Sequence, residues 1–129
     1  MCKSKLNPGG VLVTQSGQAG IKQHPVVFTS IHNTLKQVFP RVFPMNQAVY
    51  SFMDEWGWNL AVQEESASNN PQNLTKEEVD KRIASRINGE LKFLDGESWR
   101  GVFALSKLHR RNLAAETAVP PAAQKVRSF

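Results

Sequence analysis

Two places in the sequence carry side chains suited to recognising a ligand. Gln15 is the polar residue that closes an apolar run at residues 11–13, and its amide can both donate and accept a hydrogen bond. Such an amide suits an amine or a hydroxyl group, although an amide that satisfies its own loop fits the same position. Gln15 is therefore a candidate for binding a ligand, and a purely structural role in its own loop is the alternative.

The second place is the stretch of residues 50–58, where aromatic side chains surround an acidic pair. An aromatic wall with carboxylates attracts cationic, partly apolar ligands. Packing in a core is the alternative use of such rings, and Trp58 in particular is expected to be buried. The aromatic residues are Tyr50, Phe52, Trp56 and Trp58, and the acidic pair is Asp54 and Glu55.

Complete catalytic constellations are absent from the sequence. It has no phosphate loop, no glycine fingerprint after the first strand and no pair of cysteines or histidines at metal-ligand spacing. His24, His32 and His109 are expected to be solvated side chains on helix surfaces. Ser16 lacks the glycine two residues earlier that a nucleophile elbow requires. We accordingly assign no catalytic, cofactor-binding or metal-binding residue.

Composition and length limit the class of protein. With 129 residues, 40% of them hydrophobic and 21% charged, the chain is expected to form at most one folded domain. Its single cysteine, Cys2, can form no internal disulfide. No apolar run is long enough to cross a bilayer and residues 1–5 do not begin a signal peptide, so the expected compartment is the cytosol, with no membrane partner.

The net charge of +5 raises the question of nucleic-acid binding. The charges are scattered, and the one dense basic cluster has no aromatic residues interleaved to stack on bases. We expect the basic cluster to be a solvent-exposed surface without a ligand. The alternative is that the protein is a small nucleic-acid binder. The cluster contains Lys107, His109, Arg110 and Arg111.

The apolar run at residues 11–13 predicts a strand that is covered on both faces and lies inside a sheet. Too few residues precede it to supply neighbouring strands, which predicts that the chain is the back part of a larger α/β fold. A helix at residues 25–39 should follow, with Val27, Ile31, Leu35 and Val38 on its buried face.

Two antiparallel strands are expected within residues 42–62, with Pro44 placing the first at an edge. Thr75 and Glu78 have capping-box spacing and predict a helix at residues 75–87. A short extended piece at residues 90–94, a turn at 95–96 and a last helix beginning near Ser106 complete the expected elements. The expected organisation is a sheet portion at 1–62, a polar linker at 63–74, a helical appendage at 75–117 and a frayed tail at 118–129.

Several blocks of the sequence, in this order, resemble the polyamine aminopropyltransferases, and the thermospermine and spermine synthase branch in particular. The resemblance covers residues 6–117. Its blocks are residues 6–15, 34–40, 56–58, 86–91 and 93–96.

The resemblance implies the carboxyl-terminal portion of a methyltransferase-like (Rossmann-like), doubly wound α/β sheet, with about three strands plus helices and therefore incomplete. In this family an acceptor amine attacks decarboxylated S-adenosylmethionine, the co-substrate, and takes its aminopropyl group. By resemblance, Gln15 matches a glutamine beside the reacting amine, and Tyr50 and Trp56 fall in the segment that lines the polyamine channel.

The sequence departs from the family in two respects. Tyr50 stands where the family has a proline, and Met45 or a neighbour stands where it has a tyrosine. The family's glycine-rich loop, nucleoside-binding acids and catalytic aspartate lie upstream of the matched part, and Asp54 and Glu55 are not their equivalents.

Two functions follow as expectations. The chain is a carboxyl-terminal fragment of an aminopropyltransferase that is inactive alone and binds a polyamine with no cofactor of its own. The alternative is a non-catalytic binding or regulatory module that pairs with a complete homologue or with a missing amino-terminal half.

Overall fold

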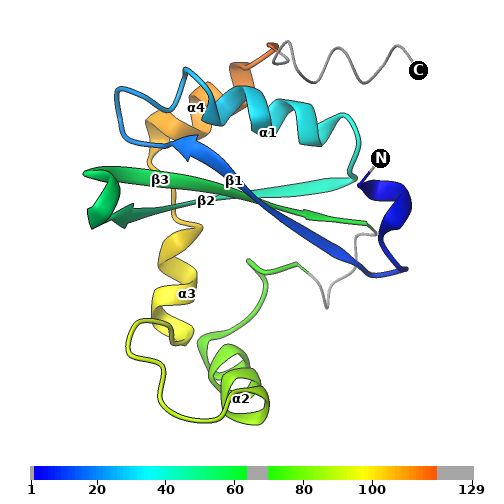
Figure 1. Cartoon of the computed structure of the whole chain (residues 1–129), viewed down its shortest axis with the longest axis vertical. Helices are drawn as coiled ribbons and strands as arrows, with labels where there is room; N and C mark the ends of the chain where they lie inside the picture. The colour runs from blue at the N-terminus through cyan, green and yellow to red at the C-terminus, as the bar shows by residue number, and fades with distance from the viewer. Residues whose placement is uncertain (1, 64–69, 119–129) are drawn as a thin grey trace.

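The computed structural model of the protein describes residues 2–63 and 70–118, in which a three-stranded sheet lies between helices (Figure 1). Helices α1 and α4 cover one face of the sheet and α3 packs on the other, with α2 beyond it. In chain order the elements are η1 (Lys3–Lys5), β1 (Val11–Gln18), α1 (Phe28–Lys36), β2 (Arg41–Val49), η2 (Tyr50–Phe52), β3 (Asp54–Val62), α2 (Lys76–Arg86), α3 (Gly96–Val102) and α4 (Lys107–Ala115).

Strand β3 is the centre of the sheet, whose order is β1-β3-β2 with both pairings antiparallel. The expected antiparallel pairing of β2 with β3 is confirmed, as is the edge position of Pro44 in β2. Because an edge strand has one unpaired side, proline can occupy it without breaking the ladder. In β1, Gln15 lies opposite Trp58, and a register shift then places Gln18 opposite Trp56.

Strand β1 differs from the expectation. Among the described residues it pairs with β3 alone, so it forms the other edge of the sheet. Val11 is 45% exposed and Val13 is 54% exposed, and their cross-strand partners Val62 and Leu60 belong to the core on the α3 side of the sheet. The prediction that β1 is covered on both faces is therefore wrong for the structure that this chain forms.

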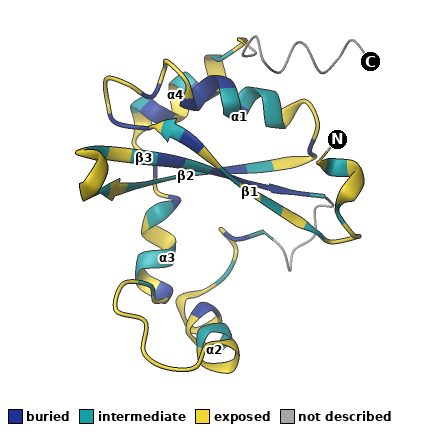
Figure 2. Ribbon diagram, in the orientation of Figure 1, coloured by how far each residue is buried: buried dark blue, intermediate teal, exposed yellow. Residues whose placement is uncertain are grey.

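The face beneath α1 and α4 is partly polar. Its apolar core joins Ala19 and Phe28 to Leu105 and Leu113 of the last segment (Figure 2). Beside this core the fully buried side chain of Asn59 points from β3 toward α1. The strand face thus offers α1 a hydrogen-bonding surface as well as an apolar one.

That polarity explains why α1 departs from the expected stripe. Residues 21–27 form turns, and the helix begins at Phe28 instead of Pro25. Val27 and Val38 are more than two-fifths exposed, whereas Thr29 and His32 are buried. The buried face of α1 is rotated toward the polar groups of the sheet, a preference that apolar periodicity alone does not reveal.

The opposite face carries the larger apolar core. Phe43, Leu60 and Val62 of the sheet pack against Phe103 just after α3. Trp99 extends this core, with its ring edge-on to Phe103 at a centroid distance of 5.3 Å. Trp58 is only half-buried, which corrects the expectation that it is a core residue.

The carboxyl-terminal helices can be compared with the helix starts and the turn that the sequence predicts. The capping box is confirmed, since the Thr75 hydroxyl accepts from the Glu78 amide and the Glu78 carboxylate accepts from the Thr75 amide. Helix α4 begins after Ser106, as expected. The turn expected at residues 95–96 is wrong, because Asp95 caps α3, and no strand forms at residues 90–94. Residues 64–69 of the expected linker and 119–129 of the expected tail lie outside the described residues.

Candidate functional site

Gln15 and Trp56, two of the three residues expected to bind a ligand, lie near each other on the sheet. Gln15 is exposed near the end of β1, opposite Trp58, and Trp56 is one step further along the same face of β3. Side chains at such diagonal positions on neighbouring strands are within reach of each other when they are long or aromatic. The structure therefore brings an amide and two indoles together at one end of the sheet.

Trp56 has an additional feature. Its ring packs against Phe52 at a centroid distance of 4.3 Å, and its buried Nε1 has no hydrogen-bond partner among the described residues. A buried indole N–H usually has an acceptor, so this donor is available for one.

Tyr50, the third expected residue, is not brought to that group. It lies in η2 at the tip of the β2–β3 hairpin and is 92% exposed. It borders a shallow hollow of about 320 Å³ together with Met53 and Asp54. In the described part of the chain, Tyr50 is a solvent-facing residue at the same end of the sheet.

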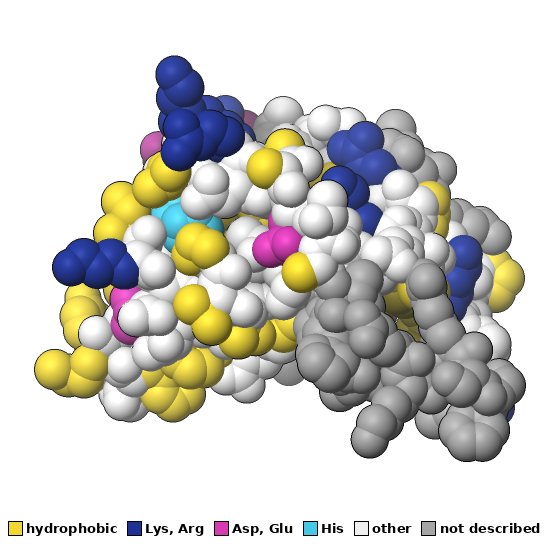
Figure 3. Space-filling model, turned by 90° about the horizontal axis from the view of Figure 1, so that it is seen from above, with side chains coloured by type: hydrophobic (Ala, Val, Ile, Leu, Met, Phe, Trp, Pro, Cys, Tyr) yellow, Lys and Arg dark blue, Asp and Glu magenta, His cyan; other side chains and the backbone are white. Residues whose placement is uncertain are grey.

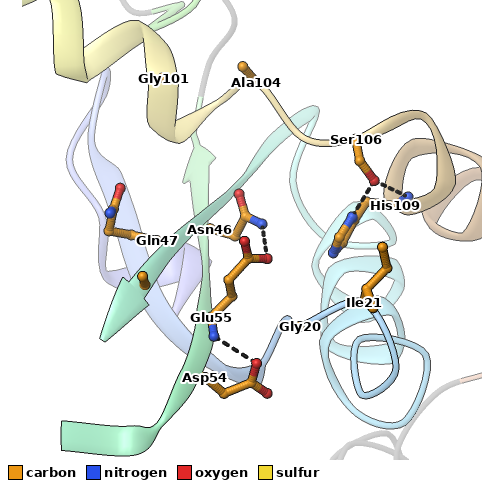
Figure 4. A pocket seen from close by; sticks show the side chains of 11 residues that line it. Gly20, Ile21, Asn46, Gln47, Asp54, Glu55, Gly101, Ala104, Ser106 and His109 are labelled. Atoms are coloured by element: carbon orange, nitrogen blue, oxygen red, sulfur yellow. Dashed lines mark hydrogen bonds between the residues drawn. The ribbon is translucent and has the colours of Figure 1, made fainter. Parts of the chain in front are cut away.

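A larger cleft of about 690 Å³ opens at this end, on the side of α4 (Figure 4). It lies between the loop after β1, the hairpin of β2 and β3, and the connection from α3 to α4. We call it the acidic cleft, because its charged lining side chains are carboxylates and none of its lining residues is Lys or Arg. The lining residues are Gly20, Ile21, Asn46, Gln47, Ala48, Asp54, Glu55, Gly101, Ala104, Ser106 and His109.

The two carboxylates are held by short local hydrogen bonds. Asp54 Oδ1 accepts from the Glu55 amide at 2.8 Å, and Glu55 Oε2 accepts from the Asn46 side-chain amide at 3.0 Å. Gly20 allows Asp54 this place, since a Cβ on Gly20 would lie 2.2 Å from Asp54 Oδ1. One oxygen of each carboxylate has no hydrogen bond within the described residues, so the cleft can accept from a cationic or polar donor.

The buried His109 lines the acidic cleft and packs against a second buried histidine, His24. His109 Nε2 donates to the Ala19 carbonyl at 2.6 Å, and its Nδ1 accepts from the Ser106 hydroxyl at 2.6 Å. The His24 ring packs 4.2 Å from the His109 ring, donates from Nδ1 to the Gly20 carbonyl and accepts from the Asn112 side chain. Because both nitrogens of each ring are hydrogen-bonded, the pair ties α4 to the loop after β1.

These contacts correct the sequence-based picture of the histidines. His24 is 0% exposed, His109 3% and His32 6%, so none of the three is solvated. His32 donates from Nδ1 to Asn59 Oδ1 at 2.7 Å, and Asn59 donates onward to the Ser16 hydroxyl. Burial, aided by the nearby Lys36 charge, lowers the pKa of His32 below its ordinary value, although the bond to Asn59 opposes that shift.

The side chains of the basic cluster at residues 107–111 do not form one continuous exposed surface. His109 points inward, and the Arg110 guanidinium donates to the Leu105 carbonyl. On the face seen in Figure 3, the Lys and Arg side chains stand in separate groups between apolar and neutral ones.

Two further classes of site find no support in the described residues. Residues 2–63 and 70–118 contain no group of three His, Cys, Asp or Glu side chains placed to hold a metal ion. Within the same ranges, no helix has the length and apolar character needed to span a bilayer.

Sequence reasoning singled out Gln15, Trp56 and the acidic pair as candidates, and it did not anticipate that Asn46 and His109 line the cleft beside the acidic pair. Asn46 and His109 reach it from segments far apart in the chain, and only the Ser106 to His109 spacing, typical of a helix cap, gave a local signal. What the arrangement can do chemically is bind a ligand with ammonium or hydroxyl donors and an apolar body.

Comparison with known proteins gives a consistent set of relatives, although no protein-family model matches the sequence. The chain is 44% identical over 117 residues to thermospermine synthase ACAULIS5 of Arabidopsis thaliana. It is 39% identical over 115 residues to polyamine aminopropyltransferase 2 of Hyperthermus butylicus. These matches cover 91% and 89% of the chain, but only 33% and 35% of the relatives.

Solved structures agree at the level of the fold. The chain resembles a spermidine synthase in complex with the transition state analogue AdoDATO, with a TM-score of 0.69 at 18% identity. It resembles spermidine synthase from Thermotoga maritima with a TM-score of 0.62 at 19% identity. Both matches cover 89% of the chain and 36% and 38% of the solved chains. The chain thus spans about a third of the length of the relatives that it matches.

Proposed function

The chain is homologous to the carboxyl-terminal part of the polyamine aminopropyltransferases, and on that premise we propose that it forms the acceptor-amine side of such an enzyme and is inactive alone. The observation that carries the proposal is the presence, at one end of the sheet, of Gln15 and Trp56 on one face and of Asp54 and Glu55 in the acidic cleft. The amide, the indole and the carboxylates suit a ligand that is a chain of methylenes with several ammonium groups.

In the proposed reaction, a neutral amine nitrogen of the polyamine attacks the methylene carbon beside the sulfonium of decarboxylated S-adenosylmethionine. A carbon–nitrogen bond forms, the carbon–sulfur bond breaks and methylthioadenosine leaves. The amine must lose its proton to a carboxylate, because a protonated nitrogen has no lone pair with which to attack.

The chain's own residues contribute binding and orientation in this scheme. Gln15 holds the reacting amine, while Trp56 and Tyr50 line the path of the polyamine. The carboxylate that takes the proton and the groups that bind the nucleoside are supplied by a polypeptide corresponding to the unmatched part of the relatives. The reaction takes place in the cytosol.

An activity assay with complementation tests the proposal. The chain alone should give no methylthioadenosine with spermidine and decarboxylated S-adenosylmethionine, and calorimetry should detect no binding of the nucleoside. Addition of the unmatched segment of thermospermine synthase should yield turnover, which Gln15→Ala lowers by about tenfold, the effect of losing one hydrogen bond of about 1.4 kcal/mol to the reacting amine. Turnover or tight nucleoside binding by the chain alone would refute it.

A second function is favoured by the edge of β1. The stretch of residues 6–20 contains no charged residue, although the chain carries 16 basic and 11 acidic residues. Uncharged, unpaired edge strands readily accept another strand. A non-catalytic module that docks through β1 onto a complete homologue, or onto a missing half, would use this edge, and light scattering of the mixed proteins detects such a complex.

A further inference from the structure

The connection between α2 and α3 contains the dipeptide Asn88–Gly89, the one asparagine followed by glycine among the 129 residues. Both residues are exposed, and neither lies in a helix or strand. The last helical bond before them is donated by the Ile87 amide to the Ile83 carbonyl. The dipeptide is therefore outside the hydrogen-bonded ladder of α2.

The reactive groups of this dipeptide are free within the described part of the chain. No hydrogen bond engages the Asn88 side chain or the Gly89 amide nitrogen in residues 70–118 or 2–63. Gly89 has a φ of +96°, and outside Gly89 and its two chain neighbours no atom lies within 4 Å of the place where a Cβ would stand. Glycine has no side chain to shield its nitrogen, so the nitrogen can approach the Asn88 amide carbon.

Other asparagines of the chain are protected by contrast. Asn59 is fully buried and bonded at both ends of its amide. Asn46 donates to Glu55, and Asn112 lies within α4 and donates to His24. Asn73 is exposed but is followed by Leu74, whose branched side chain crowds the nitrogen that would have to attack.

We propose that Asn88 is a spontaneous modification site, at which deamidation converts the residue to aspartate and isoaspartate. The Gly89 nitrogen attacks Cγ of Asn88, the side-chain nitrogen leaves as ammonia and a five-membered succinimide forms. Water then adds to one of the two succinimide carbonyls. Opening at one side leaves aspartate, and opening at the other leaves isoaspartate, in which the main chain runs through the former side chain.

The modification changes charge and chain path at a defined place. Either product lowers the formal net charge from +5 to +4 and puts a carboxylate just after the carboxyl end of α2, where the helix dipole disfavours it. Isoaspartate also lengthens the main chain by one carbon between α2 and α3. These helices are joined by the hydrogen bond from the Gly96 amide to Asp80 Oδ1 at 2.7 Å. We expect isoaspartate, more than aspartate, to weaken that junction.

The test is peptide mapping of the intact chain after prolonged incubation in mildly alkaline buffer, with a mildly acidic sample for comparison. The peptide that contains Asn88 should become heavier by about 1 Da and split into two products, one a substrate of protein isoaspartyl methyltransferase. Alkaline buffer should accelerate the change, because the attacking nitrogen must lose its proton. The peptide that contains Asn73 should stay unmodified.

Two variants and a peptide control complete the experiment. Asn88→Gln should abolish the product, since a six-membered ring forms far more slowly, whereas the exposed control Asn73→Gln should leave it unchanged. A synthetic peptide of residues 83–94 shows that the conditions suffice. An unmodified Asn88 in the folded chain, under conditions that convert the peptide, would overturn the proposal. Equal product in Asn88→Gln would overturn it as well, by placing the chemistry at another residue.

Discussion

At the scale of single residues, the buried polar groups under α1 and α4 decide how the helices sit on the sheet. Asn59 is fully buried and bonded to both His32 and Ser16, so it joins α1, β3 and β1 in one network. Such a network is stabilising only while every member is satisfied, because each orphaned polar group keeps its full desolvation cost.

Replacing Asn59 with alanine should therefore lower the free energy of unfolding by about 3 kcal/mol, the cost of two orphaned polar groups and a small cavity. Denaturant unfolding of the purified chain measures the change. Asn46→Ala is the matched control: its side-chain amide bonds to the exposed Glu55, and its loss should cost less than about 1 kcal/mol. Equal losses in the two variants would contradict the network argument.

His32 makes the stability of the same region depend on pH. Burial holds the pKa of His32 below its ordinary value of 6.5, so the unfolded chain takes up a proton at a higher pH than the folded chain does. Its stabilising effect is then complete above 6.5 and declines as the pH falls from 6.5 toward the lowered folded-state value.

The variant His32→Gln should show a flatter loss of stability on acidification from neutral pH. His24 and His109 are present in both proteins, so the difference between the two pH profiles reports His32 alone. Chemical unfolding at a series of pH values provides these profiles. Parallel profiles for the two proteins would rule out the proposed coupling.

The sequence did not reveal these histidines as buried because their partners are remote. His109 bonds to a carbonyl 90 positions away, and His24 to an asparagine 88 positions away. Periodicity and spacing report on neighbours within a helix or strand and carry no information about such contacts. Gln15 and Trp56 could be singled out since their local setting, a strand end and an aromatic run, already suggested binding.

At the scale of elements, local cap chemistry could be predicted wherever a polar residue and its partner are three positions apart. The starts of α2 and α4 follow from Thr75 and Ser106 in this way. Helix α3 was missed, since Asp95 before a glycine is also typical of a turn and its reciprocal partner is Ser98, not the usual Glu or Gln.

The cap of α2 makes a prediction for the helical appendage. Thr75→Ala removes the acceptor of the Glu78 amide and should cost about 1 kcal/mol of stability. Hydrogen exchange should become faster in the first turn of α2 before it changes elsewhere. Ser85→Ala, in the last turn of the same helix, is the control and should leave exchange in the first turn unchanged. Slower or unaltered exchange in Thr75→Ala would contradict the role of the cap.

At the scale of the whole molecule, the two edges of the sheet differ in a way that the sequence only partly predicts. Strand β2 carries Pro44, which blocks the approach of another strand. Strand β1 has no proline and no charge, and its Val11 and Val13 are exposed. The apolar pattern correctly marked residues 11–13 as part of a strand, but the prediction that this strand is covered on both faces is wrong for the described residues.

The open edge gives the last prediction. If β1 docks onto the unmatched segment of an aminopropyltransferase, Val13→Lys should weaken the complex at least about tenfold, because a charge would be buried in the new interface. Val26→Lys adds the same charge at a valine that is 68% exposed in the loop before α1 and should bind like the unmodified chain. Light scattering across a concentration series measures both affinities. Equal binding by the two variants would place the partner elsewhere and remove the main physical reason for regarding β1 as a docking edge.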